Sequence, residues 1–265
     1  MKQEIFSDDN NSMAWHTIGQ GKPLLMLHGW GSSSRAFHPL AIKLQSIRTS
    51  YLPDLPGFGE SPEPSSPWSV TDYAEFLEKF IEDTFPDKKI DLLVHSFGAR
   101  IAIKLLGNES VANTIDKVIF TGAAGLKPRR KVSYYLKKYT AKALKLPFFL
   151  LPGNMRKKGL NRLRKTSAWK MLGSTDYQQL SGVMRETFVK TVTEYLDQEI
   201  KNINHEILLL WGKNDQATPI DQANRMENGL KESTLIVIEN AGHYAFLDRP
   251  THFAEIVKAY LEPGN

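Results

Sequence analysis

The sequence predicts an α/β fold in which a mostly parallel central sheet is flanked by helices and interrupted by a helical insertion. Short, continuously apolar runs alternate with stretches of helical composition, a pattern typical of parallel strands that are buried on both faces. Roughly eighty residues in the second half contain no strand-like run. The chain has 265 residues, of which 41% are hydrophobic, so it is long enough for one large domain that carries an insertion.

Six segments are predicted to be strands: five are short apolar runs, and the other, residues 47–52, leads directly into a loop. The first leads into the glycine-rich loop HGWGS. The second leads into PDLPGFGESPEPSSP, which is predicted to be a loop from its Pro, Gly and Ser content. The third precedes the motif HSFG. The expected strands are residues 23–27, 47–52, 90–94, 117–121, 206–211 and 235–238.

Helices are predicted between these strands. Ser69 and Asp72 have the spacing of a capping box and open an amphipathic helix that continues to about residue 85. The stretch after HSFG has helical composition and stops at Gly107. Thr218 and Pro219 resemble the N-cap and first residue of another helix. Two further helices are expected at residues 36–45 and 250–261.

The composition excludes several classes of protein. Charged residues make up 24% and aromatic residues 10%, which argues against disordered, collagenous and coiled-coil chains. Cysteine is absent, which excludes disulfides, thiolate catalysis and the commonest structural zinc sites. Residues 1–15 contain no apolar signal segment, and the longest dense apolar run, residues 146–152, is too short to span a membrane. We therefore expect a soluble cytoplasmic protein.

The basic charge is concentrated in one segment. The net charge is +5, but residues 127–170 contain fifteen Lys or Arg and no Asp or Glu, which leaves 19 basic and 29 acidic residues elsewhere. A basic segment on an otherwise acidic protein indicates that one face meets a distinct environment. The simplest such environment is solvent. Nucleic-acid binding is not expected, because the chain lacks a recognised nucleic-acid-binding motif.

Two more specific interpretations of the basic segment remain open. Its cations could point inward and favour an anionic acyl substrate; the candidates are Lys127, Arg129, Arg130, Arg156, Lys157 and Arg164. Alternatively they could point outward beside an apolar run and lay the segment on an anionic membrane surface. That apolar run consists of Phe148, Phe149, Leu150 and Leu151.

Ser96 is the candidate nucleophile. It lies between the predicted strand at 90–94 and a predicted helix, with Gly98 two residues later. This context can hold a serine on a sharp turn that exposes its Oγ at the carboxyl edge of the sheet. The free N–H groups and the dipole at the amino end of the helix can also stabilise a developing oxyanion.

His243 is the candidate base, because serine is a poor nucleophile unless an imidazole accepts its proton. It lies in AGHYAFLDRP, between the last strand and the last helix, where a loop at the carboxyl edge of the sheet is expected. Several other histidines lack a comparable position and are interpreted as structural or solvated: His16, His38, His205 and His252.

Asp215 is the candidate carboxylate that would orient the imidazole. It follows the strand at 206–211, in GKNDQATP, so it is expected at the same edge of the sheet as Ser96 and His243. The alternative acid, Asp116, precedes its strand and should lie at the opposite end.

An oxyanion hole requires two backbone N–H donors. The first is expected from Phe97, which follows the nucleophile. The second is expected from Trp30, which lies between two glycines in HGWG that let the backbone approach a substrate. His28, together with Gly29, is expected to support this loop and not to exchange protons.

The motifs HGWG, PDLPGFGESP, HSFG, WGKNDQATP and AGHYAFLDRP together resemble the α/β-hydrolase superfamily over nearly the whole chain apart from the insertion. They most resemble the lidded esterase and carbon–carbon-bond hydrolase branch. The resemblance implies an α/β-hydrolase fold with an eight-stranded sheet, a Ser96–Asp215–His243 triad, an oxyanion hole from the Trp30 and Phe97 amides, and no cofactor or metal. Epoxide hydrolases and haloalkane dehalogenases share the fold but carry Asp at the nucleophile position, so Ser96 argues against both.

The resemblance also implies a division into a core and a lid. The core domain is expected at residues 1–125 and 205–265. A helical lid at residues 126–204 is inserted after the sixth core strand and covers the carboxyl edge of the sheet, where open α/β folds bind ligands.

One residue departs from the family pattern G-x-S-x-G. Val94 occupies the position of the first glycine. A β-branched residue there is expected to crowd the turn or shift it, and a shift of about 1 Å in Ser96 would cost roughly 10²-fold in rate.

Two functions follow from these residues. The first is a serine hydrolase of a carboxylic ester or related small acyl compound, which works through the Ser96–His243–Asp215 triad and an acyl-enzyme intermediate. The alternative is a ligand- or partner-binding protein that kept the scaffold but has little or no activity.

Overall fold

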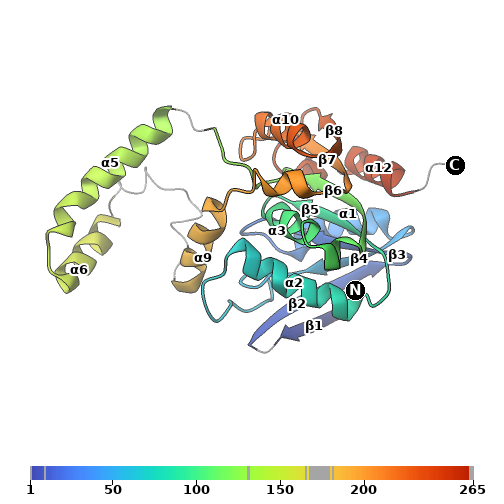
Figure 1. Ribbon diagram of the computed structural model, residues 1–265, viewed down its shortest axis with the longest axis horizontal. Coiled ribbons are helices and arrows are strands. Elements are labelled where there is room, and N and C mark those ends of the chain that lie inside the picture. The colour runs from blue at the N-terminus through green and yellow to red at the C-terminus, as the bar shows by residue number, and fades with distance from the viewer. Residues whose placement is uncertain are drawn as a thin grey trace. The chain divides into compact units, whose positions relative to one another are not determined.

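The computed structural model describes residues 2–8, 10–129, 132–164, 166, 180 and 182–262 (Figure 1). Eight strands form one sheet in the order β1-β2-β4-β3-β5-β6-β7-β8. β2 is antiparallel to β1 and β4, and every other neighbouring pair is parallel. The mostly parallel sheet confirms the predicted fold class. The strands are β1 (Lys2–Asp8), β2 (Asn11–Gly19), β3 (Lys22–Leu27), β4 (Arg48–Pro53), β5 (Ile90–His95), β6 (Ile115–Thr121), β7 (Glu206–Gly212) and β8 (Glu232–Ile238).

Helices cover both faces of the sheet. Leu24, Leu25 and Met26 of β3 are fully buried, although successive residues of a strand point to opposite faces. Leu24 and Met26 belong to a core cluster with Leu40 of α1 (His38–Leu44) and Phe253 of α12 (Pro250–Leu261). α2 (Val70–Thr84) packs against α3 (Phe97–Leu106), and α3 contacts β5. The continuous apolar character of the central strands is explained by this two-sided burial.

The expected capping box is present at the start of α2. The Asp72 N–H donates to Ser69 Oγ at 3.2 Å, and the Ser69 N–H donates to Asp72 Oδ2 at 2.6 Å. The expected N-cap at Thr218 is not formed, because α10 begins one residue later than predicted. The remaining helices are η1 (Ser34–Phe37), α4 (Glu109–Ala112), α5 (Val132–Phe149), α6 (Gly153–Arg164), α9 (Gly182–Thr193), η2 (Glu199–Asn202), α10 (Ile220–Gly229) and α11 (Ala245–Asp248).

The chain divides into two compact units. One comprises Met1–Lys127 and Glu186–Asn265 and contains the sheet; the other is Pro128–Arg185 and contains α5 and α6. The second boundary lies nearer residue 185 than the expected residue 204. The reason is local packing, because Thr187 and Leu196 are buried: Thr187 Oγ1 accepts a hydrogen bond from the Trp68 N–H at 3.1 Å, and Leu196 donates to the Gly125 carbonyl at 2.9 Å. A lid role for the second unit stays a prediction.

Within the described part of the chain, none of the helices combines the length and the apolar character needed to cross a membrane. The longest of them is α5, which has 18 residues and carries several lysines.

Candidate active site

Ser96 lies on a strained turn between β5 and α3. Its φ of 49° and ψ of −106° are in a region that residues other than glycine rarely adopt. Backbone hydrogen bonds hold the turn: the Ser96 N–H donates to the Thr121 carbonyl at 3.2 Å, and the Ser96 carbonyl accepts from Ala99 and Ala124 at 3.1 Å each. A serine on a strand-to-helix turn of this kind is positioned for nucleophilic attack at the carboxyl end of the sheet.

Val94 does not displace this turn. It is fully buried in β5 and stays in parallel register with Leu27 of β3 and Phe120 of β6. Ser96 keeps its positive φ two residues later. The elbow conformation is therefore retained with the branched side chain at position 94.

His243 and Asp215 meet directly at the carboxyl edge of the sheet. His243, in the loop between β8 and α11, has its Nδ1 2.8 Å from Asp215 Oδ2. Asp215 is buried in the loop after β7. Its Oδ1 accepts from the backbone N–H groups of Ala217 at 2.8 Å and Thr218 at 2.9 Å. Because the carboxylate accepts, His243 Nδ1 carries the hydrogen, which leaves Nε2 as the basic nitrogen of the neutral ring.

The surroundings keep Asp215 ionised. Burial by itself would raise its pKa, but hydrogen bonds from His243 and Thr218 outweigh that effect and lower the pKa below its usual value. Thr218 Oγ1 lies 2.8 Å from Asp215 Oδ2 and 3.0 Å from the Gly122 carbonyl, and its single proton serves one of these acceptors at a time. The carboxylate is thus fixed on the side of the imidazole away from Nε2.

Ser96 and His243 each contact the chain at the end of β6. The Thr121 carbonyl holds the Ser96 N–H, and a Cβ built on the next residue, Gly122, would lie 3.1 Å from His243 Nδ1. Gly122 has a φ of 51°, so both its conformation and the small space beside His243 favour glycine there. Among the described residues, no hydrogen bond joins Ser96 Oγ to the His243 ring. The structure therefore pairs the candidate base with the candidate acid and brings the serine into their neighbourhood.

His95 is a second imidazole at this site. It ends β5 next to Ser96, and its Nε2 lies 3.0 Å from the His243 carbonyl, so Nε2 must donate the hydrogen. The His95 and His243 rings are 4.6 Å apart at their centroids. Burial, with a smaller contribution from His243, lowers the pKa of His95 to about 3, so the ring is neutral at ordinary pH. A neutral ring adds no positive charge beside the candidate base.

The two amides expected to form an oxyanion hole lie near Ser96. A Cβ on Gly29 would come 3.2 Å from Ser96 Cβ and 2.8 Å from His95 Nδ1, so only glycine permits this approach of the loop after β3. The Trp30 ring packs edge-on against Phe97 with a centroid distance of 5.3 Å. In the described part of the chain, the backbone N–H groups of Trp30 and Phe97 have no hydrogen-bond acceptor. Both donors are thus available to an added oxygen.

His28 holds the loop after β3 to the loop after β4. Its Nε2 accepts from the Leu55 N–H at 3.0 Å, so the hydrogen is on Nδ1, which donates to the Gly29 carbonyl at 2.8 Å. Burial lowers the pKa of His28 below its usual value. Since both ring nitrogens have backbone partners and the ring resists protonation, this geometry fits a supporting role.

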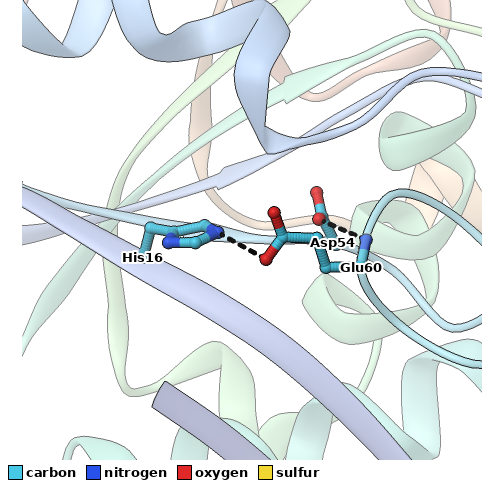
Figure 2. Close-up of side chains that lie close together, drawn as sticks. All are labelled: His16, Asp54 and Glu60. Atoms are coloured by element: carbon cyan, nitrogen blue, oxygen red, sulfur yellow. Dashed lines mark hydrogen bonds and ion pairs between the residues drawn. The ribbon is translucent and has the colours of Figure 1, made fainter. Parts of the chain in front are cut away.

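A cluster of His16, Asp54 and Glu60 lies beside these loops (Figure 2). Its ligand atoms lie within 4.8 Å of one another, and an imidazole with two carboxylates is a donor set that transition metals accept. The carboxylates already have partners, however. Asp54 accepts from the Ser34 N–H at 2.6 Å and from the Glu60 N–H at 2.8 Å, while Arg35 lies 3.2 Å from Glu60. We interpret the cluster as a structural link between the loop after β3 and the loop after β4.

The alternative acid, Asp116, is in the amino-terminal half of β6 and pairs with Lys22, the first residue of β3. It therefore lies at the opposite end of the parallel strands from Ser96, which follows the carboxyl end of β5. His205 also lies away from the candidate triad, with its Nε2 3.0 Å from the Ala112 carbonyl.

The basic residues considered as contacts for an anionic substrate are described only in part. Arg130 and the side chain of Arg164 lie outside the described residues. The Arg156 guanidinium lies 4.0 Å from the centroid of the Phe149 ring, and Lys157 is exposed.

The family model described as "alpha/beta hydrolase fold" matches residues 22–250. The chain belongs to the α/β hydrolase family. This match extends from β3 to the start of α12 and includes the loops that carry Ser96, Asp215 and His243.

Curated proteins and solved structures are similar to this α/β hydrolase along nearly its whole length. A pimeloyl-(acyl-carrier protein) methyl ester esterase from Aliivibrio salmonicida is 23% identical and covers 95% of this chain and 97% of its own. A 2-hydroxy-6-oxo-2,4-heptadienoate hydrolase from Pseudomonas putida is 22% identical, with coverage of 93% and 91%. The solved structure of an esterase from Exiguobacterium antarcticum superimposes with a TM-score of 0.73 at 24% identity over 96% of both chains.

Three residues of this α/β hydrolase site were not predicted from the sequence in the positions that they take. His95 adjoins the nucleophile in HSFG, which was the available signal. Thr218 was expected to cap a helix, but its hydroxyl lies at Asp215 Oδ2. Asp54 lies in the Pro- and Gly-rich loop after β4, whose sequence contains no sign that its carboxylate reaches Ser34.

Proposed function

We propose that this α/β hydrolase is a serine hydrolase that cleaves a carboxylic ester or a related small acyl compound. Ser96 is the nucleophile, His243 the general base and acid, and Asp215 the group that fixes the orientation of His243. The observation that carries the proposal is the 2.8 Å contact between His243 Nδ1 and Asp215 Oδ2 beside a serine with a φ of 49°. This combination of a strained serine and an oriented imidazole suits nucleophilic catalysis.

The reaction has two halves. Ser96 Oγ attacks the acyl carbonyl while His243 Nε2 takes the hydroxyl proton, and the collapse of the tetrahedral intermediate expels the alcohol, which receives that proton from His243. Water then attacks the acyl-enzyme, again losing a proton to His243. Collapse of this second intermediate releases the acid, and the proton returns to Ser96 Oγ. These steps use only side chains of the chain, its backbone amides and water.

The amides of Trp30 and Phe97 are proposed to hold the oxyanion in both tetrahedral intermediates. Support comes from two observations: neither N–H has an acceptor among the described residues, and the loop that carries Trp30 approaches Ser96 at Gly29. Donors fixed before the reaction stabilise the charge without reorganisation, and one such donor contributes about 10²- to 10³-fold in rate.

The names of the relatives suggest two substrate classes. One relative is named as an esterase of a methyl ester, and the other as a hydrolase of a hydroxy-oxo-heptadienoate. Both substrates have an electrophilic carbonyl that a serine can attack. The second compact unit is proposed to act as the lid, and its basic residues make anionic acyl compounds worth testing.

The test is steady-state hydrolysis of p-nitrophenyl esters of graded chain length, with neutral and anionic acyl groups. We expect turnover by the wild type, and a loss of at least about 10⁴-fold in kcat for Ser96→Ala, because the acyl-enzyme cannot form. Ser65→Ala is the matched control. It changes an exposed serine outside the Ser96 turn and should keep wild-type rates.

The same measurement separates the alternative function. A binding protein without activity would show saturable binding of an acyl compound and no turnover in any ester or dienoate. Retention of full activity by Ser96→Ala would contradict the proposed nucleophile, whichever substrate is used.

A further inference from the structure

We propose that the hairpin of α5 and α6 docks on an anionic lipid surface. The hairpin presents four large apolar side chains around its turn, which we call the apolar tip: Leu146, Phe149, Leu150 and Met155. Leu150 is 89% exposed and Leu146 is 68% exposed. Monomeric soluble proteins rarely leave a group of large apolar side chains in water, and such groups mark interaction sites.

The packing inside the hairpin explains why these side chains face outward. Figure 1 shows α5 and α6 running antiparallel on either side of a short turn. A Cβ on Gly159 of α6 would come 2.4 Å from the Phe148 ring of α5, so Phe148 fills the space between the two helices. Phe149 is the next residue and Leu146 lies one helical turn before it, on a face that Phe148 does not occupy. The tip is therefore not used to hold the hairpin together.

Cations surround the apolar tip. Lys142, Lys157, Lys158 and Arg162 are exposed on the two helices. Lys142 lies four residues before Leu146 on the same face of α5. On α6, Met155 and Lys158 are likewise one turn apart. The Arg156 guanidinium lies 4.0 Å from the centroid of the Phe149 ring, so this cation contacts one side chain of the apolar tip directly.

No acidic residue occurs anywhere in residues 127–170, although fifteen basic residues do. An apolar insertion surrounded by Lys and Arg matches an anionic membrane surface, where the apolar groups enter the headgroup boundary and the cations meet lipid phosphates. A second copy of the chain is disfavoured as the occupant, because two such hairpins would repel each other. An acidic soluble partner would match the cations but would leave the apolar tip unexplained.

The experiment is cosedimentation of the full chain with vesicles of phosphatidylcholine, with and without phosphatidylglycerol. We expect binding to the mixed vesicles only, and weaker binding as salt is added, because surface charges are then screened. Leu150→Ser is expected to lower the partition coefficient about tenfold. Lys157→Glu with Lys158→Glu is expected to lower it by roughly 100-fold.

The matched controls are Ile42→Ser, at a half-exposed apolar residue of α1, and Lys88→Glu, at an exposed lysine outside the hairpin. Both should bind the mixed vesicles like the wild type. Binding that Leu150→Ser leaves unchanged would overturn the proposal. So would the absence of binding to mixed vesicles, or dimers that disappear in the tip variants. The Ser96→Ala variant should bind vesicles normally, so the outcome is independent of the proposed hydrolase activity.

Discussion

The imidazole of His95 gives the candidate active site a fixed, uncharged neighbour. Its Nε2–H donates to the His243 carbonyl, which ties the backbone of the proposed base to the residue next to the proposed nucleophile. His95 is almost completely buried, and burial is the main reason that its pKa lies at about 3 instead of 6.5. We infer that His95 positions His243 and does not itself transfer protons.

The depressed pKa of His95 predicts a pH-dependent stability. Below pH 6.5 the unfolded chain binds a proton on His95 that the folded chain resists until the pH approaches 3. This contribution is therefore complete above pH 6.5 and is lost as the pH falls, at about 1.4 kcal/mol per pH unit. Urea unfolding of the wild type at about pH 7 and pH 5 measures the slope.

His95→Gln is the matched variant, because the amide can keep an N–H donor but cannot titrate. We expect its free energy of unfolding to fall less than that of the wild type between the two pH values. The difference should be about 2 kcal/mol, corresponding to one proton. Equal slopes in the two proteins would show that His95 is not buried in its neutral form.

At the scale of the elements, Asp54 joins two loops that border the site. One carboxylate oxygen accepts from the Ser34 N–H at the start of η1, and the other accepts from the Glu60 N–H in the loop after β4. The first of these loops also carries Trp30. Fixing its backbone at both ends, by His28 and by Asp54, would hold the proposed oxyanion donor in place.

Asp54→Asn is expected to destabilise the protein by about 2–3 kcal/mol, because the asparagine side chain has a single acceptor oxygen for the two N–H donors, of Ser34 and Glu60, that Asp54 binds. We also expect kcat/KM to fall while the variant remains folded, since the Trp30 loop loses one of its attachments. Denaturant unfolding and ester hydrolysis measure the two effects.

Glu60→Gln is the control for this experiment. Its side chain is partly exposed, and the Glu60 backbone N–H that binds Asp54 remains, so a change of less than about 1 kcal/mol is expected. Equal effects of the two substitutions would contradict the role given to Asp54.

The elements differed in how well the sequence predicted them. β3, β5, β6, β7 and β8 were found because each contains a continuous apolar run, and β4, RTSYLP, was found from the Pro- and Gly-rich loop that follows it. β1 and β2 were not predicted, because neither contains a long continuous apolar run: they form an antiparallel hairpin, in which residues 3–8 lie alternately exposed and half-buried. Thr218 followed by Pro219 had the signature of a helix start. The Thr218 hydroxyl instead lies within hydrogen-bonding distance of Asp215 Oδ2, and the sequence contains no signal for this contact.

At the scale of the whole molecule, a buried ion network joins the early strands to the last helix. Asp91 is fully buried in β5 and contacts Lys22 Nζ at 2.6 Å and Arg48 Nε at 2.7 Å. Arg48 also donates to the Leu261 carbonyl at 2.6 Å. The network lies at the amino ends of the strands, away from Ser96, so it belongs to the scaffold and not to the site.

Asp91→Asn is expected to lower the free energy of unfolding by about 3–5 kcal/mol, because it leaves the buried guanidinium of Arg48 without its counterion. Asp116→Asn is the matched control: Asp116 also pairs with Lys22, but its side chain is 53% exposed, and a loss below about 1 kcal/mol is expected. Chemical denaturation of the two variants and the wild type measures the free energies of unfolding. Folded samples of both should hydrolyse esters at wild-type rates; a large loss of activity would place this network in the site.

The whole-molecule arrangement explains how far the candidate site could be predicted. In a parallel sheet, the residues that follow the strands meet at one edge, so the chain order Ser96, Asp215, His243 was sufficient to expect them there. His243 Nδ1 and Asp215 Oδ2 lie 2.8 Å apart, and the catalytic roles of the three residues stay a prediction. The neutrality of His95 could not be predicted, because it depends on burial among residues distant in the sequence. The boundary at residue 185 likewise depends on packing.

The most direct test of the proposed chemistry is reaction of the folded protein with a fluorophosphonate, followed by peptide mapping. Such reagents phosphonylate a serine only where a base and oxyanion donors activate it. We predict one adduct per chain, located on Ser96, and strongly slowed labelling in His243→Ala. An unlabelled wild-type protein, or an adduct on any other residue, would contradict the account.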